Sequence, residues 1–169
     1  VGRFNPAKNY NFLFEIVNDI FEKDNNAILL QVGVDKIKGG NLCKNFIKES
    51  ENQNRVIFMG MRNDINDLLQ AMDVFLFPSV NEGLGIALIE AQATGLTCIV
   101  SKEGIPPEAY ISDWIEGVSL KASFSDWADI VLRSKDRLYM DREYNHIKNK
   151  EFDIYTVSKW LEEFYLKIV

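Results

Sequence analysis

The sequence predicts an α/β protein with a Rossmann-like, doubly wound and mostly parallel β-sheet that carries helices on both faces. Short apolar runs alternate with longer segments whose apolar residues recur at helical spacing, which is typical of βαβ units. The chain has 169 residues, 47% of them hydrophobic and 26% charged, enough for one domain with its own core. We therefore expect a single domain over 1–169, whose last part, about 123–169, is helical.

The apolar runs predict strands that are buried on both faces. Four of them are short, rich in β-branched or aromatic residues, and apolar at successive positions, as in a parallel sheet covered on both sides. They occupy 27–33, 55–60, 73–78 and 96–101. Residues 117–120 are a candidate for a further short strand. Val1–Arg3 has the character of the end of a strand whose start is missing.

The segments between these runs predict helices. The expected helices cover 12–21, 65–72 with a cap at Asn63 or Asp64, 85–95 with a stop at Gly95, 124–132 and 157–168. We expect Phe152, Tyr155 and the last apolar stripe to belong to the core. Trp114, Trp127 and Trp160 are expected in the core or at a seam with another domain.

Ligands of such folds bind outside the carboxyl ends of the strands. The strand-to-helix loops at that edge are 2–9, 33–40, 60–64, 79–85 and 102–108.

Charge and cysteine content exclude several classes of function. The formal net charge is −6, and an acidic chain without a basic run is poorly suited to nucleic acid. Cys43 and Cys98 are far apart and form no C-x-x-C pair, which argues against a zinc site or a disulfide framework. Cys98 is expected to be a buried thiol, which fits a cytoplasmic setting. No apolar run is long enough to cross a bilayer. The sequence contains no D-x-D pair, which argues against a metal-dependent class of enzyme.

The loop before the helix at 85–95 is the main candidate for a ligand site. A helix start attracts phosphate through its free N–H groups and its dipole, and Gly83 and Gly85 allow a close approach. Glu82 precedes the helix and Glu90 lies five residues into it, about 7.5 Å along its axis. The two carboxylates would flank a gap of diphosphate size and accept hydrogen bonds from sugar or ribose hydroxyls.

Arg3 and Lys8 occupy the first loop at the same edge. An arginine fork and a lysine point charge suit a diphosphate, and both would offset the repulsion between the two glutamates. Arg62 is open between two interpretations, because a salt bridge to Asp64 or Asp67 would explain it as well as a ligand does.

These residues resemble the donor-binding half of family 4 (group 1) retaining glycosyltransferases with the GT-B fold. The string from Glu82 to Glu90 is an E-x7-E motif that follows Phe77-Pro78-Ser79. The opening from Val1 to Asn9 and the loop from Gly60 to Asp64 are similar to the same family. The segment 90–96 and the later Ile105-Pro106 resemble its capsular and exopolysaccharide branch. The resemblance covers about residues 1–120.

The resemblance implies a role for each matching position. Glu82 would contact hydroxyls of the donor sugar, Glu90 the ribose, and Arg62 would lie near the nucleobase. Catalysis would fall to Glu82, Arg3 and Lys8, since the two cations would stabilise the departing diphosphate. The donor-binding set would be Gly2, Arg3, Lys8, Arg62, Glu82, Gly83, Leu84, Gly85, Ile86 and Glu90.

The resemblance also implies partners. The donor would be a nucleotide-diphospho-sugar, in the first place a UDP-sugar, used without metal or other cofactor. A glycan or lipid-linked acceptor of surface polysaccharide synthesis would bind through an N-terminal domain, which we expect to be missing here. Alone, the chain is expected to be inactive, because that domain would supply the acceptor site, the other wall of the cleft and a functional histidine. The single histidine here, His146, matches nothing catalytic. A longer protein could contact a membrane peripherally.

Some features leave alternatives open. Gly33-Val34-Asp35 replaces the usual Gly-x-Gly, and Gly104-Ile105 replaces paired glycines, so the donor's identity is not fixed. A GT-B-fold epimerase or phosphorylase half and a non-catalytic interaction domain also fit the pattern. A nicotinamide-binding module does not, because the first loop lacks G-x-G-x-x-G. A hydrolase carboxylate pair would not need Arg3 and Lys8.

Overall fold

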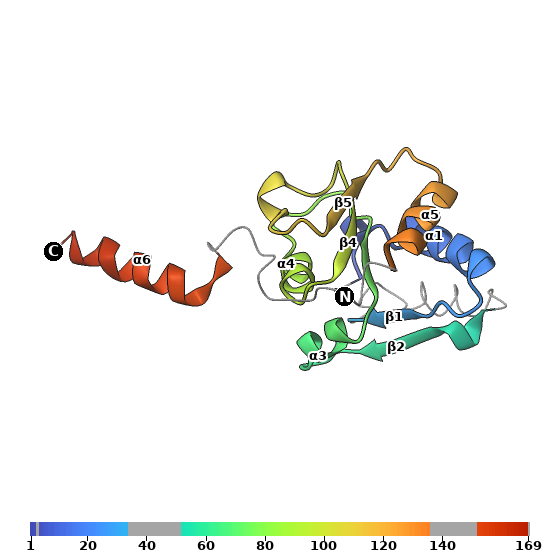
Figure 1. Ribbon diagram of the computed structural model, residues 1–169, viewed down its shortest axis with the longest axis horizontal. Coiled ribbons are helices and arrows are strands. Elements are labelled where there is room, and N and C mark those ends of the chain that lie inside the picture. Colours follow the sequence, from blue (N-terminus) through green and yellow to red (C-terminus); the bar gives the residue numbers. More distant parts are fainter. Residues whose placement is uncertain (3, 34–51, 136–151, 169) are drawn as a thin grey trace.

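The computed structural model describes residues 1–2, 4–33, 52–135 and 152–168 (Figure 1). Its helices are α1 (Tyr10–Lys23), α3 (Ile65–Gln70), α4 (Ile86–Ala93), α5 (Phe124–Ser134) and α6 (Ile154–Leu166), with 3-10 turns at Pro6–Lys8, Gln53–Arg55 and Pro107–Ala109. Its strands are β1 (Leu29–Val32), β2 (Val56–Gly60), β3 (Val74–Phe77), β4 (Thr97–Ser101) and β5 (Ile115–Val118). The four predicted apolar runs form β1, β2, β3 and β4, and β5 begins two residues earlier than expected.

Every strand pair in the described residues is parallel, which confirms the predicted α/β class. β1 pairs with β2, and β3, β4 and β5 form a second group in that order. The single continuous sheet that the sequence predicts is therefore divided between β1 and β3. Among the described residues, no strand pairs with both β1 and β3 to join the two groups.

The burial of β4 explains why its apolar run becomes a strand. All five residues of β4 are buried, because helices and loops cover both of its faces. Cys98 is fully buried there, as predicted, and burial raises the pKa of its thiol well above the ordinary value. On the other side α1 packs along α5, where Trp127 is fully buried and its indole N–H donates to the carbonyl of Ser119 at 3.1 Å.

The ends of the helices follow from local hydrogen bonds. Ser123 and Asp126 form a reciprocal capping box at the start of α5. Asp64 occupies the capping position of α3, as expected, but its side chain makes no capping bond. Gly95, the predicted stop, has a φ of 75° just beyond α4, a left-handed conformation that glycine adopts readily.

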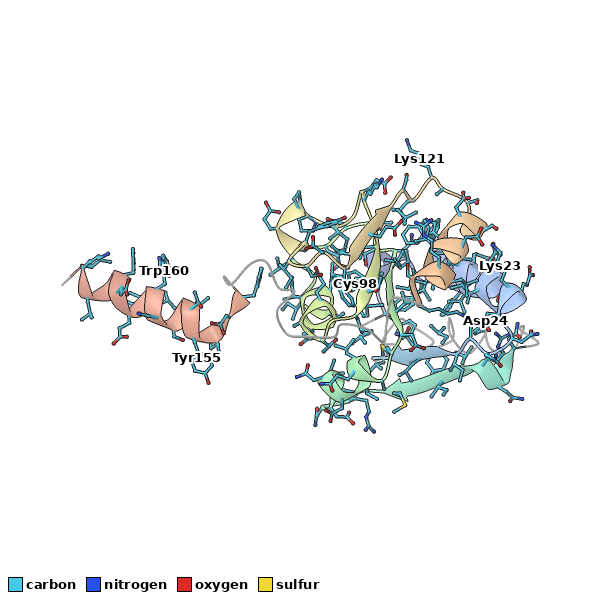
Figure 2. The ribbon with its side chains drawn as sticks, in the orientation of Figure 1. Lys23, Asp24, Cys98, Lys121, Tyr155 and Trp160 are labelled. Atoms are coloured by element: carbon cyan, nitrogen blue, oxygen red, sulfur yellow. The ribbon has the colours of Figure 1, made fainter. Side chains whose placement is uncertain are left out.

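The expectation that the last stripe belongs to the core is wrong for the described residues. No residue of α6 is buried, and Trp160 and Tyr155 are 59% and 84% exposed (Figure 2). Phe152 is 38% exposed. The apolar face exists, but α6 lies away from the β-strands (Figure 1), so no described element covers that face. Trp114, in contrast, is half-buried.

Several expectations fall on residues outside the described ranges. Arg3, Cys43 and His146 lie there, as does most of the second loop, 34–40. Within the described ranges, no helix combines the length and apolar character needed to cross a bilayer.

Candidate functional site

The candidate site lies where the first loop meets the loop between β3 and α4. The amide of Gly2 donates to the carbonyl of Val32 at 2.9 Å, which places the first loop beside the carboxyl end of β1. Asn5 then caps the following 3-10 turn by accepting from the amide of Lys8 at 3.1 Å. Asn9 ends that turn with a φ of 55°. These local contacts fix the direction in which Lys8 leaves the backbone.

Lys8 and Glu82 form an ion pair at this meeting point. Their Nζ and Oε1 atoms are 2.8 Å apart, and the two side chains are only 16% and 10% exposed. The contact has the separation of an ion pair without the angles of a hydrogen bond. Lys8 Nζ also lies 4.3 Å from the centre of the Phe77 ring, a cation–π distance. The structure therefore brings together two of the three predicted catalytic residues, held by an aromatic side chain at the end of β3.

The loop 78–85 is attached to its neighbours through the backbone. The amide of Val80 donates to the carbonyl of Ala7 at 2.8 Å, and the amide of Glu82 donates to the carbonyl of Gly104 at 2.9 Å. The first bond joins this loop to the turn that carries Lys8. The second joins it to the loop after β4. Three loops that are distant in sequence thus hold the Glu82 backbone in place.

The approach of Gly104 to this loop is unusually close. A Cβ built on Gly104 would lie 1.9 Å from the carbonyl oxygen of Ser79, far inside van der Waals contact. The hydroxyl of Ser101 donates to that same carbonyl. Only glycine fits at position 104, which explains a single glycine at this point of the chain.

The start of α4 presents unpaired main-chain donors. Gly85 is the N-cap residue of α4, with a φ of 72°, and no side-chain hydrogen bond caps the helix there. Within the described residues, the amides of Gly83, Leu84, Gly85 and Ile86 donate to no acceptor. A helix start of this kind attracts an anion through its N–H groups and its dipole. Glu90 lies half-buried in the same helix, and Gly2, whose carbonyl accepts from Tyr10 at 3.5 Å, borders Lys8.

Arg62 lies apart from this arrangement. Its Nε donates to Oδ1 of Asp64 at 2.8 Å, and both side chains are exposed. The hydrogen bond from Arg62 lowers the pKa of the Asp64 carboxyl and raises that of the guanidinium. The structure thus shows the salt bridge to Asp64, which was one of the two interpretations of Arg62 that the sequence left open.

Sequence reasoning missed two residues of the site. Phe77 supports Lys8, and Gly104 lets two loops approach each other. Both residues belong to segments that the sequence analysis singled out, Phe77-Pro78-Ser79 and Gly104-Ile105. A motif of this kind does not indicate which distant residue a side chain or a backbone group will contact. No cluster of three or more His, Cys, Asp or Glu side chains suited to a metal occurs in the described ranges.

A parallel α/β fold with a glycine-lined helix start at the carboxyl edge of its strands is typical of domains that bind phosphorylated ligands. The chain belongs to the family described as glycosyl transferases group 1, whose family model matches residues 1–151. The resemblance predicted from the motifs is therefore confirmed, and neither alternative function left open by the sequence is favoured.

Individual proteins of this family support the assignment. The chain is 33% identical over 137 residues to the putative glycosyltransferase EpsF of Bacillus subtilis, covering 79% of this chain and 34% of EpsF. It is 27% identical over 169 residues to CapH of Staphylococcus aureus, described as a capsular polysaccharide biosynthesis glycosyltransferase, covering 98% of this chain and 46% of CapH. The chain thus spans less than half of either relative.

A solved structure shows the same fold. HepE of Anabaena, crystallised with UDP-glucose, aligns with a TM-score of 0.70 at 19% identity. The alignment covers 98% of this chain and 48% of HepE.

Proposed function

We propose that this chain is the donor-binding half of a retaining glycosyltransferase that uses a nucleotide-diphospho-sugar. The observation that carries the proposal is the ion pair of Lys8 and Glu82 beside the unpaired amides at the start of α4. One cation and a row of N–H donors suit a diphosphate. A carboxylate next to them suits the hydroxyls of a sugar.

The roles of the two paired side chains follow from this arrangement. Without a donor, Lys8 neutralises Glu82 in a largely buried position. A donor diphosphate would attract Lys8 Nζ, and Glu82 would then accept hydrogen bonds from the sugar. Lys8, together with Arg3, would stabilise the negative charge that develops on the departing diphosphate, the main form of electrostatic catalysis expected here. Glu90 would accept hydrogen bonds from the ribose. Arg62 would break its salt bridge to Asp64 only if the nucleobase lies close enough to contact it.

The donor and the acceptor remain parts of the proposal. We infer a UDP-sugar, used without a metal or other cofactor, supported by the UDP-glucose held by HepE. We infer a glycan or lipid-linked acceptor of surface polysaccharide synthesis, supported by the description of CapH. The acceptor would bind through a further domain, and any membrane contact would be peripheral and would belong to the longer protein.

Calorimetric titration with UDP, GDP, ADP and CMP, and with their common sugar conjugates, tests this proposal. We expect one diphosphate to bind selectively and Lys8→Met to weaken it by about 10- to 100-fold, because a hydrogen bond to a charged group contributes about 1.5–3 kcal/mol. The matched control is Lys159→Met, since Lys159 is exposed on α6, which lies away from the β-strands (Figure 1). Equal affinities of the two variants would contradict the assigned role of Lys8.

A further inference from the structure

A buried glutamine on α4, Gln92, joins that helix to the segment 109–112, which leads into β5. Only 2% of Gln92 is exposed. Its Oε1 atom accepts from the amide of Ile111, the amide of Ser112 and the hydroxyl of Ser112, each at 3.1 Å. Its Nε2 atom donates to the carbonyl of Ala109 at 2.7 Å. Both ends of the side-chain amide are therefore bonded to the same short segment.

The groups around Gln92 require an amide at this position. N–H and O–H donors lie on one side of it, and the carbonyls of Ala109 and, at 3.3 Å, Leu88 lie on the other. A side-chain amide has both an acceptor and two donors, so it satisfies the two sides at once. A methionine of similar length would fill the space but leave buried backbone groups without partners, which is costly. Hydrogen bonding, and not volume, thus explains the glutamine.

The segment 109–112 continues the loop that supports Glu82. The amide of Glu82 donates to the carbonyl of Gly104 at 2.9 Å, and the same loop reaches Ala109, whose carbonyl accepts from Gln92. The connection is closed, because α4 leads back along the chain to Glu82. The helix, the loop after β4 and the loop before α4 therefore hold one another in place.

The loop that carries Gly104 is attached at its two ends. At its beginning, the amide of Lys102 donates to the carbonyl of Val118 at 2.9 Å, which continues the register of β4 and β5. At its far end, Gln92 holds it against α4. A loop that is held at one end only has more conformational freedom. The place of the Gly104 carbonyl relative to α4 thus depends on Gln92.

We propose that Gln92 is a positioning residue for the donor site. By binding the segment 109–112 to α4, it keeps the Gly104 carbonyl where that carbonyl accepts from Glu82, and so fixes Glu82 relative to Glu90 on the helix. Gln92 is buried and acts through the backbone, without touching a donor. Its effect on sugar binding rests on the proposed function, in which Glu82 contacts the sugar and Glu90 the ribose. The linkage between the loops does not rest on it.

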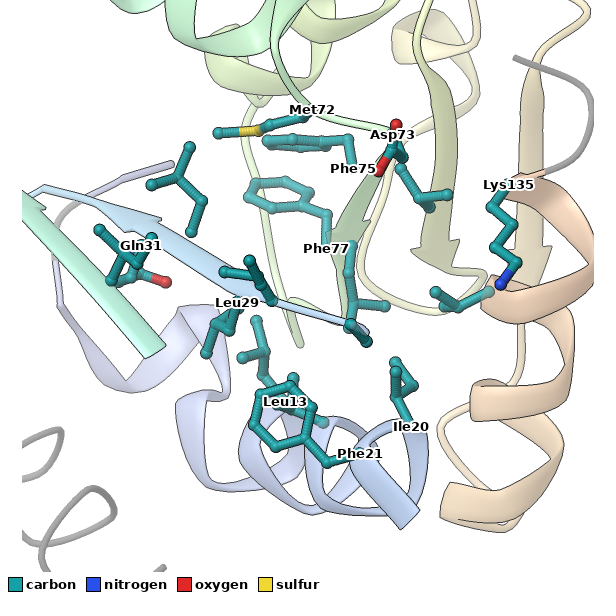
Figure 3. Close-up of a pocket in the computed structure, with 18 of the residues that line it drawn as sticks. Leu13, Ile20, Phe21, Leu29, Gln31, Met72, Asp73, Phe75, Phe77 and Lys135 are labelled. Atoms are coloured by element: carbon teal, nitrogen blue, oxygen red, sulfur yellow. The ribbon is translucent and has the colours of Figure 1, made fainter. Parts of the chain in front are cut away.

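Amide hydrogen exchange in the ligand-free chain tests the linkage. In Gln92→Met we expect the Glu82 amide to exchange about tenfold faster or more, because the loop opens more often. The Val80 amide is the internal reference, since it donates to the carbonyl of Ala7 and not to the loop after β4. The matched control is Gln31→Met, which changes another buried glutamine, on β1 beside the cavity of Figure 3. Equal acceleration of the Glu82 and Val80 amides, or equal Glu82 exchange in the two variants, would overturn the proposal.

Calorimetric titration with UDP and with UDP-glucose measures the effect on the site. We expect Gln92→Met to weaken binding of UDP-glucose by about tenfold and binding of UDP by less than about twofold, because Glu90 stays on α4 while Glu82 moves. A merely destabilised protein would lose the same factor for both ligands. Equal losses would therefore overturn the proposal and leave the proposed function standing. A parent chain that binds neither ligand would contradict the proposed function, and hydrogen exchange would then decide the present inference.

A second pair of variants keeps the test decisive if Gln92→Met folds poorly. Gln92→Glu keeps the length of the side chain, and at about pH 6 burial favours its protonated form, which accepts from Ser112 and donates to Ala109. Gln92→Asn is one methylene shorter and does not span the two sides. We expect the Glu82 amide to exchange at nearly the parent rate in Gln92→Glu and about tenfold faster in Gln92→Asn. Equal exchange in these two variants would overturn the proposal.

Discussion

Gly104 tests how closely the loops of the candidate site depend on each other. In Gly104→Ala the new methyl carbon would lie 1.9 Å from the carbonyl oxygen of Ser79, in contact with backbone that cannot rotate away. The loop 78–85 must shift, which strains the bond from the Glu82 amide to the Gly104 carbonyl. Forcing an extra carbon into a packed site costs about 1–3 kcal/mol. For a domain of this size we expect a fall in Tm of roughly 2–12 °C.

Gly83→Ala is the matched control. A Cβ on Gly83 meets nothing within 4 Å, so the same change of residue adds no clash in the same loop system. Its free energy of unfolding should stay within about 1 kcal/mol of the parent, with a small gain from the stiffer unfolded chain. Differential scanning calorimetry of both variants measures the difference. If Gly104→Ala unfolds at the same temperature as Gly83→Ala, the close packing of the loops is refuted.

Three further predictions follow from the structure. Glu90→Ala should weaken binding of the bare nucleotide and of its sugar conjugate alike, whereas Glu82→Ala should weaken only the conjugate; calorimetry that finds equal losses for the bare nucleotide would contradict these roles. Trp127→Ala should cost about 3–5 kcal/mol in urea unfolding, because the indole is fully buried, and a loss below about 1 kcal/mol would speak against that burial. Hydrogen bonds from Lys135 and Ser123 lower the pKa values of Asp24 and Asp126. The contribution of these two carboxylates to the free energy of unfolding should therefore be fully present above about pH 4 and be lost as the pH drops through their folded-state pKa values. Urea unfolding at pH 7 and pH 3 checks the sign.

The sequence predicted the elements whose burial is decided locally. β3 and β4 are continuous apolar runs, so any placement with both faces covered makes them strands. The pair of Arg62 and Asp64 is two residues apart, and the sequence already held it as one interpretation. The gathering of the first loop and the loop 78–85 at one edge also followed from chain order alone, because parallel strands share one carboxyl edge.

Contacts between distant segments could not be predicted in the same way. The approach of Lys8 to Phe77 depends on how two loops meet in space, and no spacing rule encodes it. The apolar stripe of α6 shows the opposite limit. Periodicity indicates that one face is apolar, but it does not say what covers that face, and Trp160 is 59% exposed in the structure.

The backbone bonds that hold the loop 78–85 bear on how fast a ligand can bind. The Val80 and Glu82 amides are engaged with Ala7 and Gly104 before any ligand arrives, so the loop does not have to become ordered during association. A ligand would meet a preformed surface and would need only to separate Lys8 from Glu82. Association should then be governed by diffusion and ionic strength, and changes in affinity among ligands should be found mainly in the dissociation rate.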